Sequence, residues 1–367
     1  MNKEQITAEV LAAFALPEGQ LKELAPYGSG HINDTYQVTY DQGGIRLHYT
    51  LQRINHEIFT NPHELMDNID RVTKHLLHKI RERDAVTKQR TVRLLRTTND
   101  LTYVRDDKGN YWRMYIFVEH ARSYEILETE QQAYHIAKAF SQFQRDLTDL
   151  EGDRLYVTIP DFHNTPKRLE YFENVLKNDP YDRAKNVQRE IDFALSLKDE
   201  AATLIKLQES GDIPERITHN DTKSNNILVD DLTGEGVCVI DLDTVMPGLV
   251  LYDFGDMLRS GTCPAAEDEI NLEQVYMQFH MYEALLHGYL DGSDGFLTPA
   301  EIEYLPFSGK LITFEIGLRF LTDYLNGDKY FKTARPNHNL DRCRNQFKLV
   351  QSMTDQMDRM KSLLRNY

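Results

Sequence analysis

The chain has 367 residues, of which 41% are hydrophobic, and a formal net charge of −16. This length and composition are typical of a folded protein with more than one lobe, and they argue against disorder. The negative charge argues against nucleic acid as a partner, because basic surfaces bind phosphate backbones, but a metal ion and a few local cations can still hold a nucleotide.

The chain opens with an apolar run at residues 10–16. Acidic Glu4 and Glu9 precede this run, where a secretion signal would carry a basic cluster, so we predict a short amphipathic helix. No apolar stretch approaches the roughly 20 residues that a membrane span needs. We therefore expect a cytoplasmic protein that has no membrane partner.

The first third of the chain has mostly strand-like periodicity. Two strands are predicted within residues 22–40 around a Gly-Ser-Gly turn, and alternation of apolar residues predicts a third strand at 46–54. A helix is predicted at 63–80, followed by two further strands at 91–95 and 111–118. Three strands, a helix and two strands form the outline of the small lobe of a kinase.

From about residue 130 onward the periodicity becomes helical. Apolar residues at helical spacing predict four long helices: 131–147, 273–290, 301–325 and 346–364. The polar stretch 161–207 is predicted to be an inserted pair of helices. We therefore predict a two-lobed, protein-kinase-like α+β fold. Its N-lobe, with a small five-stranded antiparallel sheet, covers residues 1–118, and its larger, mainly helical C-lobe covers 119–367.

The segment HNDTKSNN at residues 219–226, which we call the catalytic loop, carries the strongest chemical signal. Asp221 and Asn226 have the D-x-x-x-x-N spacing of a kinase. Asp241 follows at the end of the apolar run 237–240. Phosphoryl transfer needs a carboxylate within reach of the attacking hydroxyl and oxygen ligands for a metal. A single acid and amide would suggest turn capping, but all three together predict Asp221 as catalytic and the other two as Mg²⁺ ligands.

These motifs resemble those of the aminoglycoside phosphotransferase family, which includes choline, homoserine and sugar kinases. Within that family, the chain is most similar to kinases that phosphorylate the C1 hydroxyl of N-acetylhexosamines. The likeness extends over nearly the whole chain, and these segments carry it: 27–33, 218–223, 240–244, 246–248, 254–256, 319–325, 327–331 and 338–340. The resemblance implies ATP as co-substrate, Mg²⁺ as cofactor, and N-acetylglucosamine or N-acetylgalactosamine as acceptor.

The resemblance also implies a set of nucleotide-binding residues. Gly28 and Gly30 lie in a turn that could be an ordinary hairpin, and the resemblance favours a loop that covers the phosphates. Phe117 and Glu119 fall in the segment where the hinge would hold adenine through backbone groups. A plain buried strand would have the same sequence pattern.

The third strand departs from the usual kinase pattern at Gln52. A lysine or arginine normally stands there and pairs with the nucleotide phosphates. Gln52 can donate a hydrogen bond but brings no charge, and Arg53 points to the opposite face by alternation. We expect Gln52 to contact the nucleotide, and ATP affinity to depend more on magnesium and backbone contacts. A nucleotide- or sugar-binding protein without turnover is the alternative that this residue suggests.

The acceptor site is the least constrained by the sequence. Arg319 and Asp323 are four residues apart on a predicted helix and could form an ion pair. The resemblance implies instead that Arg319, Tyr330 and His31 bind the sugar, although a lone histidine is more often a hydrogen-bonding residue of a loop. A kinase of the same fold for another sugar, choline or a homoserine-like substrate stays open. No heptad seam is visible, so the oligomeric state is open and compatible with a monomer.

Overall fold

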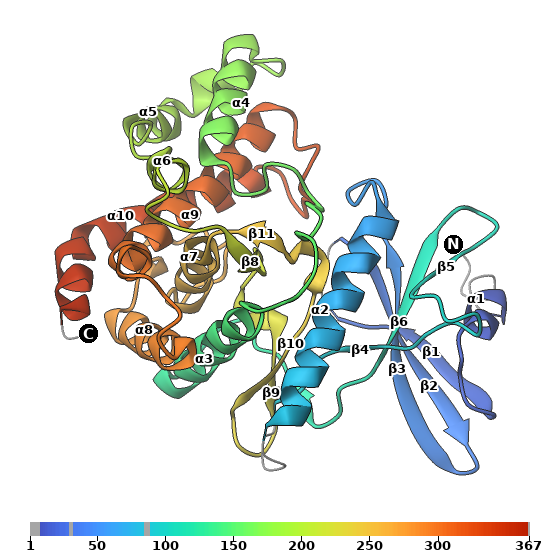
Figure 1. Ribbon diagram of the computed structural model, residues 1–367. Helices are drawn as coiled ribbons and strands as arrows, with labels where there is room; N and C mark the ends of the chain where they lie inside the picture. Colours follow the sequence, from blue (N-terminus) through green and yellow to red (C-terminus); the bar gives the residue numbers. More distant parts are fainter. Residues whose placement is uncertain (1–7, 29–31, 84–88, 366–367) are drawn as a thin grey trace.

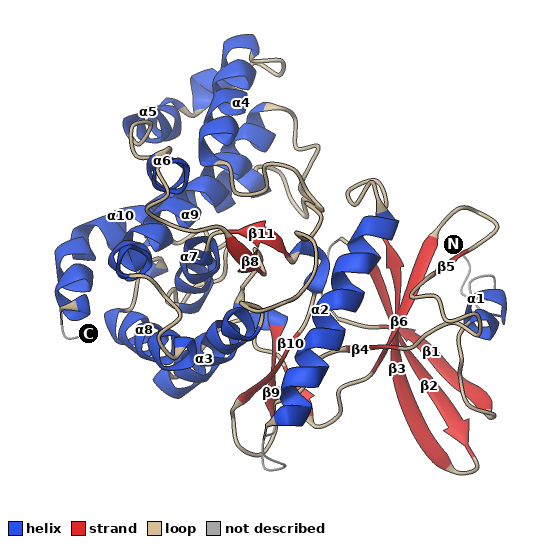
Figure 2. Ribbon diagram, viewed as in Figure 1, coloured by secondary structure: helices blue, strands red, loops and turns tan. Residues whose placement is uncertain are grey.

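The computed structural model describes residues 8–28, 32–83 and 89–365. Figure 1 shows a sheet-rich N-terminal lobe beside a larger helical C-terminal lobe, with helix α2 (Pro62–Glu82) between the sheet and the C-terminal lobe. Figure 2 shows the same division by element type, since most of the helices belong to the C-terminal lobe. The predicted two-lobed, kinase-like α+β fold is confirmed.

The N-terminal lobe is built on one antiparallel sheet. Its strand order is β1-β2-β3-β6-β4, and β5 also pairs with β6. The strands are β1 Gln20–Pro26, β2 Asp34–Gln42, β3 Ile45–Ile54, β4 Arg93–Leu94, β5 Val104–Arg105 and β6 Tyr111–Ile116. The prediction of five strands is wrong by one, because two residues in β5 are too few to show alternation. The lobe boundary between residues 118 and 119 stays a prediction.

The C-terminal lobe consists of packed helices and two small sheets, β10-β9-β7 and β11-β8. The N-terminal lobe also contains α1 Ala8–Ala13. The α-helices of the C-terminal lobe are α3 Glu130–Asp146, α4 Thr165–Asn178, α5 Gln188–Ser196, α6 Thr203–Glu209, α7 Val250–Gly261, α8 Phe279–Ser293, α9 Pro299–Leu325 and α10 His338–Leu364. The strands are β7 Ala121–Arg122, β8 Arg216–Thr218, β9 Ile227–Asp230, β10 Gly236–Val239 and β11 Met246–Gly248. Residues 161–207 hold three helices rather than the predicted pair. None of the helices in the described ranges is long and apolar enough to cross a bilayer.

Local sequence explains where the long helices begin. The Asn61 side chain accepts the backbone N–H of Glu64, and proline occupies the first position of α2, where its missing N–H costs no hydrogen bond. At the start of α9, Thr298 and Glu301 form a reciprocal capping box. These caps satisfy backbone donors that a helix start otherwise leaves unpaired.

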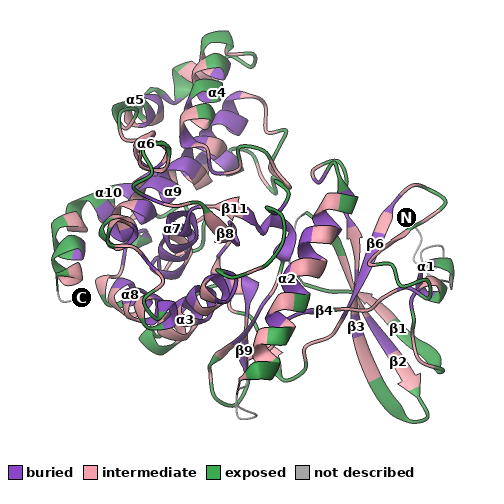
Figure 3. Ribbon diagram, viewed as in Figure 1, coloured by how far each residue is buried: buried purple, intermediate pink, exposed green. Residues whose placement is uncertain are grey.

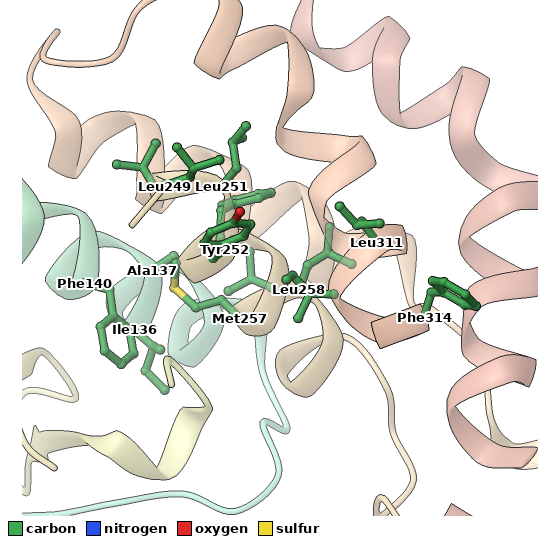
Figure 4. Packing of buried hydrophobic residues seen from close by; sticks show 14 of the residues in the cluster. Ile136, Ala137, Phe140, Leu249, Leu251, Tyr252, Met257, Leu258, Leu311 and Phe314 are labelled. Atoms are coloured by element: carbon green, nitrogen blue, oxygen red, sulfur yellow. The ribbon is translucent and has the colours of Figure 1, made fainter. Parts of the chain in front are cut away.

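The core of the C-terminal lobe surrounds α7. Figure 3 shows α7 and α9 buried along most of their lengths. Figure 4 shows Met257 and Leu258 of α7 between Phe140 of α3 and Leu311 of α9. The Phe-Gly-Asp segment at residues 254–256 lies inside α7. Such close packing makes α7 a rigid support for the loops that contact it.

Gly255 sets the separation of α7 and α9. A Cβ at this position would lie 2.6 Å from the main-chain oxygen of Ser308 and 2.7 Å from the Ile312 side chain. No methyl group fits at those distances, so the two helices can approach this closely only because the residue is glycine.

We predict that Gly255→Ala lowers the free energy of unfolding by about 1–3 kcal/mol, because the added methyl group overpacks the helix contact. Thermal unfolding followed by circular dichroism measures the change. Ser260→Ala, in the same helix, is the control, because it adds no volume and removes only a bond to the main chain of Asp256. Equal stability of the two variants would contradict the prediction.

Candidate active site

The buried carboxylate of Asp253, in α7, accepts hydrogen bonds from the catalytic loop. Its Oδ2 accepts the backbone N–H of His219 at 2.9 Å, and its Oδ1 accepts that of Asn220 at 2.6 Å. Its main-chain oxygen accepts the Thr222 hydroxyl at 2.5 Å, and the Gln144 amide donates to Oδ2 at 2.6 Å. Burial raises the pKa of Asp253, and the hydrogen bonds act in the opposite direction. The carboxylate therefore ties two successive peptides of the loop to a rigid helix.

Sequence reasoning did not identify Asp253. An aspartate in the first turn of a helix is common, because it complements the helix dipole, so nothing in the local pattern distinguishes this one. Only its contacts across 33 and 34 residues of sequence reveal its role in positioning the loop.

The bend of the catalytic loop centres on Asn220. Its backbone has φ of 66°, in the left-handed region that asparagine tolerates better than most residues. Its amide nitrogen donates to the main-chain oxygens of Thr218 at 3.2 Å and Thr244 at 2.9 Å. His163 Nε2 lies 2.8 Å from the Asn220 main-chain oxygen, and its Nδ1 lies 2.9 Å from Glu315 Oε1. This network fixes the direction in which the next residue of the loop leaves the bend.

That next residue is Asp221. Lys223 Nζ lies 3.1 Å from its Oδ2, and the Asn226 amide donates to the same oxygen at 3.1 Å and to the Asp221 main-chain oxygen at 2.8 Å. Burial would raise the pKa of Asp221, but the Lys223 ammonium and the His219 ring outweigh it and hold that pKa below its usual range. Asp221 is therefore an ionised carboxylate at neutral pH. Lys223 is a second residue that sequence reasoning left without a role.

Asp241 follows β10 and lies close to the catalytic loop. The Ile240 N–H donates to the Asn226 main-chain oxygen at 3.0 Å, which ties the two segments together. Burial and the neighbouring carboxylates of Asp243 and Asp221 raise the pKa of Asp241 to about 6. Crowded carboxylates of this kind favour binding of a cation that would relieve their repulsion.

The donor set of Asn226 and Asp241 fits Mg²⁺. The amide nitrogen of Asn226 faces Asp221, which leaves the amide oxygen as the potential ligand. Among the described residues, no three or more histidine, cysteine, aspartate or glutamate side chains are arranged to hold a metal by themselves. Mg²⁺ typically takes one or two protein ligands and completes its shell with phosphate oxygens and water, so two protein ligands suffice.

Gln52 lies beside an arginine that the sequence analysis overlooked. Gln52 Oε1 accepts a hydrogen bond from Nε of Arg113 at 2.9 Å, and Gln52 Nε2 donates to the Thr35 hydroxyl at 3.0 Å. Arg113 forms an ion pair with Asp243 of the C-terminal lobe. Asn33 donates to the other oxygen of Asp243 at 2.6 Å. Gln52 is thus one member of a polar group that spans both lobes.

The predicted hinge residues lie close to Tyr27, which immediately follows β1. The Phe117 N–H donates to the His48 main-chain oxygen at 3.1 Å, and the rings of Phe117 and Tyr27 make an edge contact with centroids 5.5 Å apart. The Glu119 carboxylate lies 2.6 Å from Nδ1 of His48. Gly28 follows Tyr27 and has φ of 77°, which only glycine adopts easily. Gly28, Phe117 and Glu119 therefore belong to one neighbourhood, and their nucleotide-binding role stays a prediction.

Two predicted site residues, Gly30 and His31, lie outside the described residues. Their proposed contacts with phosphate and sugar stay predictions from the sequence.

Among the residues predicted to bind the acceptor, Arg319 does not pair with the neighbouring Asp323. The Asp323 carboxylate instead accepts the backbone N–H groups of residues 329–331, each at 2.9 Å, and thereby shapes the turn after α9. The Arg319 guanidinium lies over aromatic rings, 5.7 Å from the centroid of Phe162 and 5.8 Å from that of Tyr330. The structure therefore brings Arg319 and Tyr330 together, and their role in binding the sugar stays a prediction.

This aromatic group is connected to the catalytic loop. Phe162 immediately precedes His163, which contacts the main chain of Asn220 as described above. A second arginine, Arg168, donates to the Phe162 main-chain oxygen at 3.2 Å. Burial, followed by the charge of Arg319, lowers the pKa of Arg168. Two cations therefore lie close together on the acceptor side, and no sequence signal pointed to Arg168.

The small sheet-rich lobe, the helical lobe and the loop that carries Asp221 define a protein of the kinase-like class. The model for the phosphotransferase enzyme family matches residues 23–290, and the chain belongs to that family.

Solved structures share the fold over nearly the whole chain. An aminoglycoside phosphotransferase from Alicyclobacillus acidocaldarius is 15% identical, with a TM-score of 0.63 over 98% of this chain and 96% of its own. Spectinomycin phosphotransferase in complex with ADP and spectinomycin is 12% identical, with a TM-score of 0.59 over 96% and 99%. A microcompartment-associated aminopropanol kinase is 16% identical, with a TM-score of 0.57 over 98% and 99%. At these identities, the likeness shows the fold alone.

The contact of His163 with Glu315 predicts a pH-dependent contribution to stability. Burial would lower the pKa of His163, but Glu315 outweighs burial and raises it. A histidine whose pKa is higher in the folded than in the unfolded protein stabilises the fold. This contribution is fully present below the pKa of the unfolded state, about 6.5, and is lost as pH rises through the pKa of the folded state. We expect His163→Gln to cost about 1.5–3 kcal/mol at pH 5.5, the range for hydrogen bonds to charged groups, and less at pH 9. Urea unfolding at both pH values measures this; a cost that does not change with pH would contradict it.

Proposed function

We propose that the protein transfers the γ-phosphoryl group of ATP to the C1 hydroxyl of an N-acetylhexosamine. Membership of the phosphotransferase enzyme family supports phosphoryl transfer. The observation that carries the proposal is the ionised Asp221 carboxylate, which accepts a hydrogen bond from Asn226 and lies close to Asp241. One carboxylate beside two candidate metal ligands supports the proposal, because these are the groups that phosphoryl transfer requires.

In this mechanism, Asp221 accepts a hydrogen bond from the attacking hydroxyl and orients its oxygen toward the γ-phosphorus. Because its pKa is low, Asp221 is a weak base, so its main contribution is orientation, and the proton leaves late as the new P–O bond forms. Lys223, beside Asp221, places a positive charge where the transferred group gains negative charge.

Asn226 and Asp241 would hold Mg²⁺, which supplies charge neutralisation to the phosphate oxygens when bound. Two observations support this fit. The pKa of Asp241 is raised by neighbouring carboxylates, and the Asn226 amide nitrogen donates to Asp221, which leaves the amide oxygen for the metal.

Residues on the acceptor side favour a sugar over an amine. Arg319 and Tyr330 offer directional donors beside aromatic rings, a combination suited to hydroxyl and amide groups. Arg168 and Arg319 give this region positive charge, which disfavours a cationic amino alcohol such as choline. The preference for the N-acetyl group and for C1 rests on the resemblance of residues 319–331 to the N-acetylhexosamine kinases.

A panel of sugars incubated with ATP and Mg²⁺ tests the proposal. N-acetylglucosamine, N-acetylgalactosamine, glucose, galactose, choline and ethanolamine are compared by ADP release, and phosphorus NMR locates the phosphate. We expect the fastest turnover with an N-acetylhexosamine and phosphorus coupling to the anomeric proton. Phosphate on another hydroxyl would overturn the C1 assignment, and measurable ATP binding without ADP from any acceptor would favour a protein without turnover.

We predict that Asp221→Asn lowers kcat by about 10²–10⁴-fold, the range that a positioned acid or base contributes. ATP affinity stays nearly unchanged, because the carboxylate acts on the acceptor hydroxyl. Steady-state kinetics and calorimetric ATP titration measure the two quantities. Turnover close to that of the wild type would refute the mechanism.

We predict that Asn226→Ala raises the Mg²⁺ concentration for half-maximal rate by at least about tenfold, because one metal ligand is lost. Asn225→Ala is the matched control, since the neighbouring Asn225 donates its amide to Glu125 instead of Asp221. Rates measured across a magnesium titration, at saturating ATP, separate the two variants. An equal effect in both would indicate damage to the loop in place of a lost ligand.

A further inference from the structure

The sheet of the N-terminal lobe contains a buried cation where its third strand lacks one. Gln52 of β3 and Arg113 of β6 are direct cross-strand partners, and their side chains bond on one face of the sheet. A kinase normally places a lysine on the third strand to pair with the nucleotide phosphates. Here the strand supplies a neutral amide, and the adjacent strand supplies a guanidinium at the same level of the sheet.

Arg113 is almost completely buried, with 1% of its side chain exposed. Burying a charge is unfavourable unless partners offset the cost, and an ion pair buried in this way often stabilises no more than apolar packing would. Its partners among the described residues are Gln52, Asp243 and the ring of Tyr115, 5.3 Å away. Stability alone is therefore a weak reason for an arginine at this position. Binding of a negatively charged ligand is a stronger reason.

The surroundings of Arg113 bring it close to the candidate metal ligand Asp241. Its partner Asp243 lies two residues after Asp241, in the same short segment as the candidate metal ligand. Burial would lower the pKa of Arg113, but Asp243 and, to a smaller extent, Asp241 outweigh burial and raise it, so both carboxylates act on the guanidinium. Asn33, which immediately precedes β2, donates a hydrogen bond to the same Asp243 carboxylate at 2.6 Å. Asn33, Arg113 and the segment that carries Asp241 are thus joined through the Asp243 carboxylate.

We propose that Arg113 is a nucleotide-binding residue that contacts the α- or β-phosphate of ATP and takes over the role of the missing strand lysine. Gln52 and Asp243 position its guanidinium: the first bonds Nε, and the second pairs with a terminal nitrogen. A guanidinium suits this task because its planar fork can donate two parallel hydrogen bonds to a phosphate. This inference rests on the proposed use of ATP and names the cation that recognises its phosphates.

The alternative is that Arg113 only ties the two lobes together through Asp243. The two roles differ in their effect on ligands. A phosphate contact affects binding of ATP and leaves binding of adenosine unchanged, because adenosine has no phosphate. A purely structural tie affects both ligands equally or neither of them.

The test measures the Kd of ATP with Mg²⁺ and the Kd of adenosine by calorimetry. We expect Arg113→Gln to weaken ATP binding by about 10- to 100-fold, the range for losing hydrogen bonds to a charged group, with adenosine affinity unchanged. Arg113→Lys, which keeps the charge but loses the fork, should weaken ATP binding less. The double variant Arg113→Gln with Gln52→Arg moves the cation to the third strand and should recover much of the loss.

Arg53→Gln is the matched control. Arg53 is on the same strand as Gln52 but pairs with Asp34 near the surface, and it should leave both affinities unchanged. Equal loss of ATP and adenosine binding in the Arg113 variants, or no loss in either, would overturn the inference. If Arg113→Gln does not fold, the comparison of Arg113→Lys with the double variant decides. ATP binding by the wild type without turnover on any acceptor would overturn the proposed function and leave this inference intact.

Discussion

The geometry of the active site depends on one buried carboxylate. Asp253 accepts the N–H groups of two successive residues, His219 and Asn220, and so holds the left-handed bend from which Asp221 projects. The carboxylate can do this because α7 is itself rigid: Gly255 allows α9 to pack at a distance that no other residue permits. Core packing and loop conformation are therefore one constraint, and a change in the helix contact would reach the catalytic loop.

Negative charge is concentrated around the catalytic loop. Asp221, Asp241 and Asp243 lie close together, and burial together with the carboxylates of Asp243 and Asp221 raises the pKa of Asp241 to about 6. Lys223 and Arg113 offset part of this charge. The remaining excess favours a metal ion, and bound Mg²⁺ would in turn favour phosphate. The overall charge of −16 is thus compatible with nucleotide binding, because phosphate groups respond mainly to the cations close to them.

The residues proposed to bind the acceptor are connected to the catalytic loop through one short segment. His163 contacts the main chain of the catalytic loop, and the adjacent Phe162 lies under Arg319. Residues that would hold the acceptor therefore share a short segment with residues that fix the position of Asp221. In the proposed mechanism, this arrangement would keep the acceptor hydroxyl and the Asp221 carboxylate aligned, which is the main requirement of phosphoryl transfer.

The sequence by itself determined the two-lobed fold, most helices and strands, and the identity of Asp221, Asn226 and Asp241 as candidates, because periodicity and motif spacing are local properties. It also marked the missing charge at Gln52. Only the tertiary structure revealed Asp253 below the loop and Arg113 beside Gln52. Their contacts span 33 to 61 residues of sequence and depend on helix packing and strand register, which no local pattern encodes. The same holds for Asp323, whose partner is the backbone of a turn rather than the arginine one helical turn away.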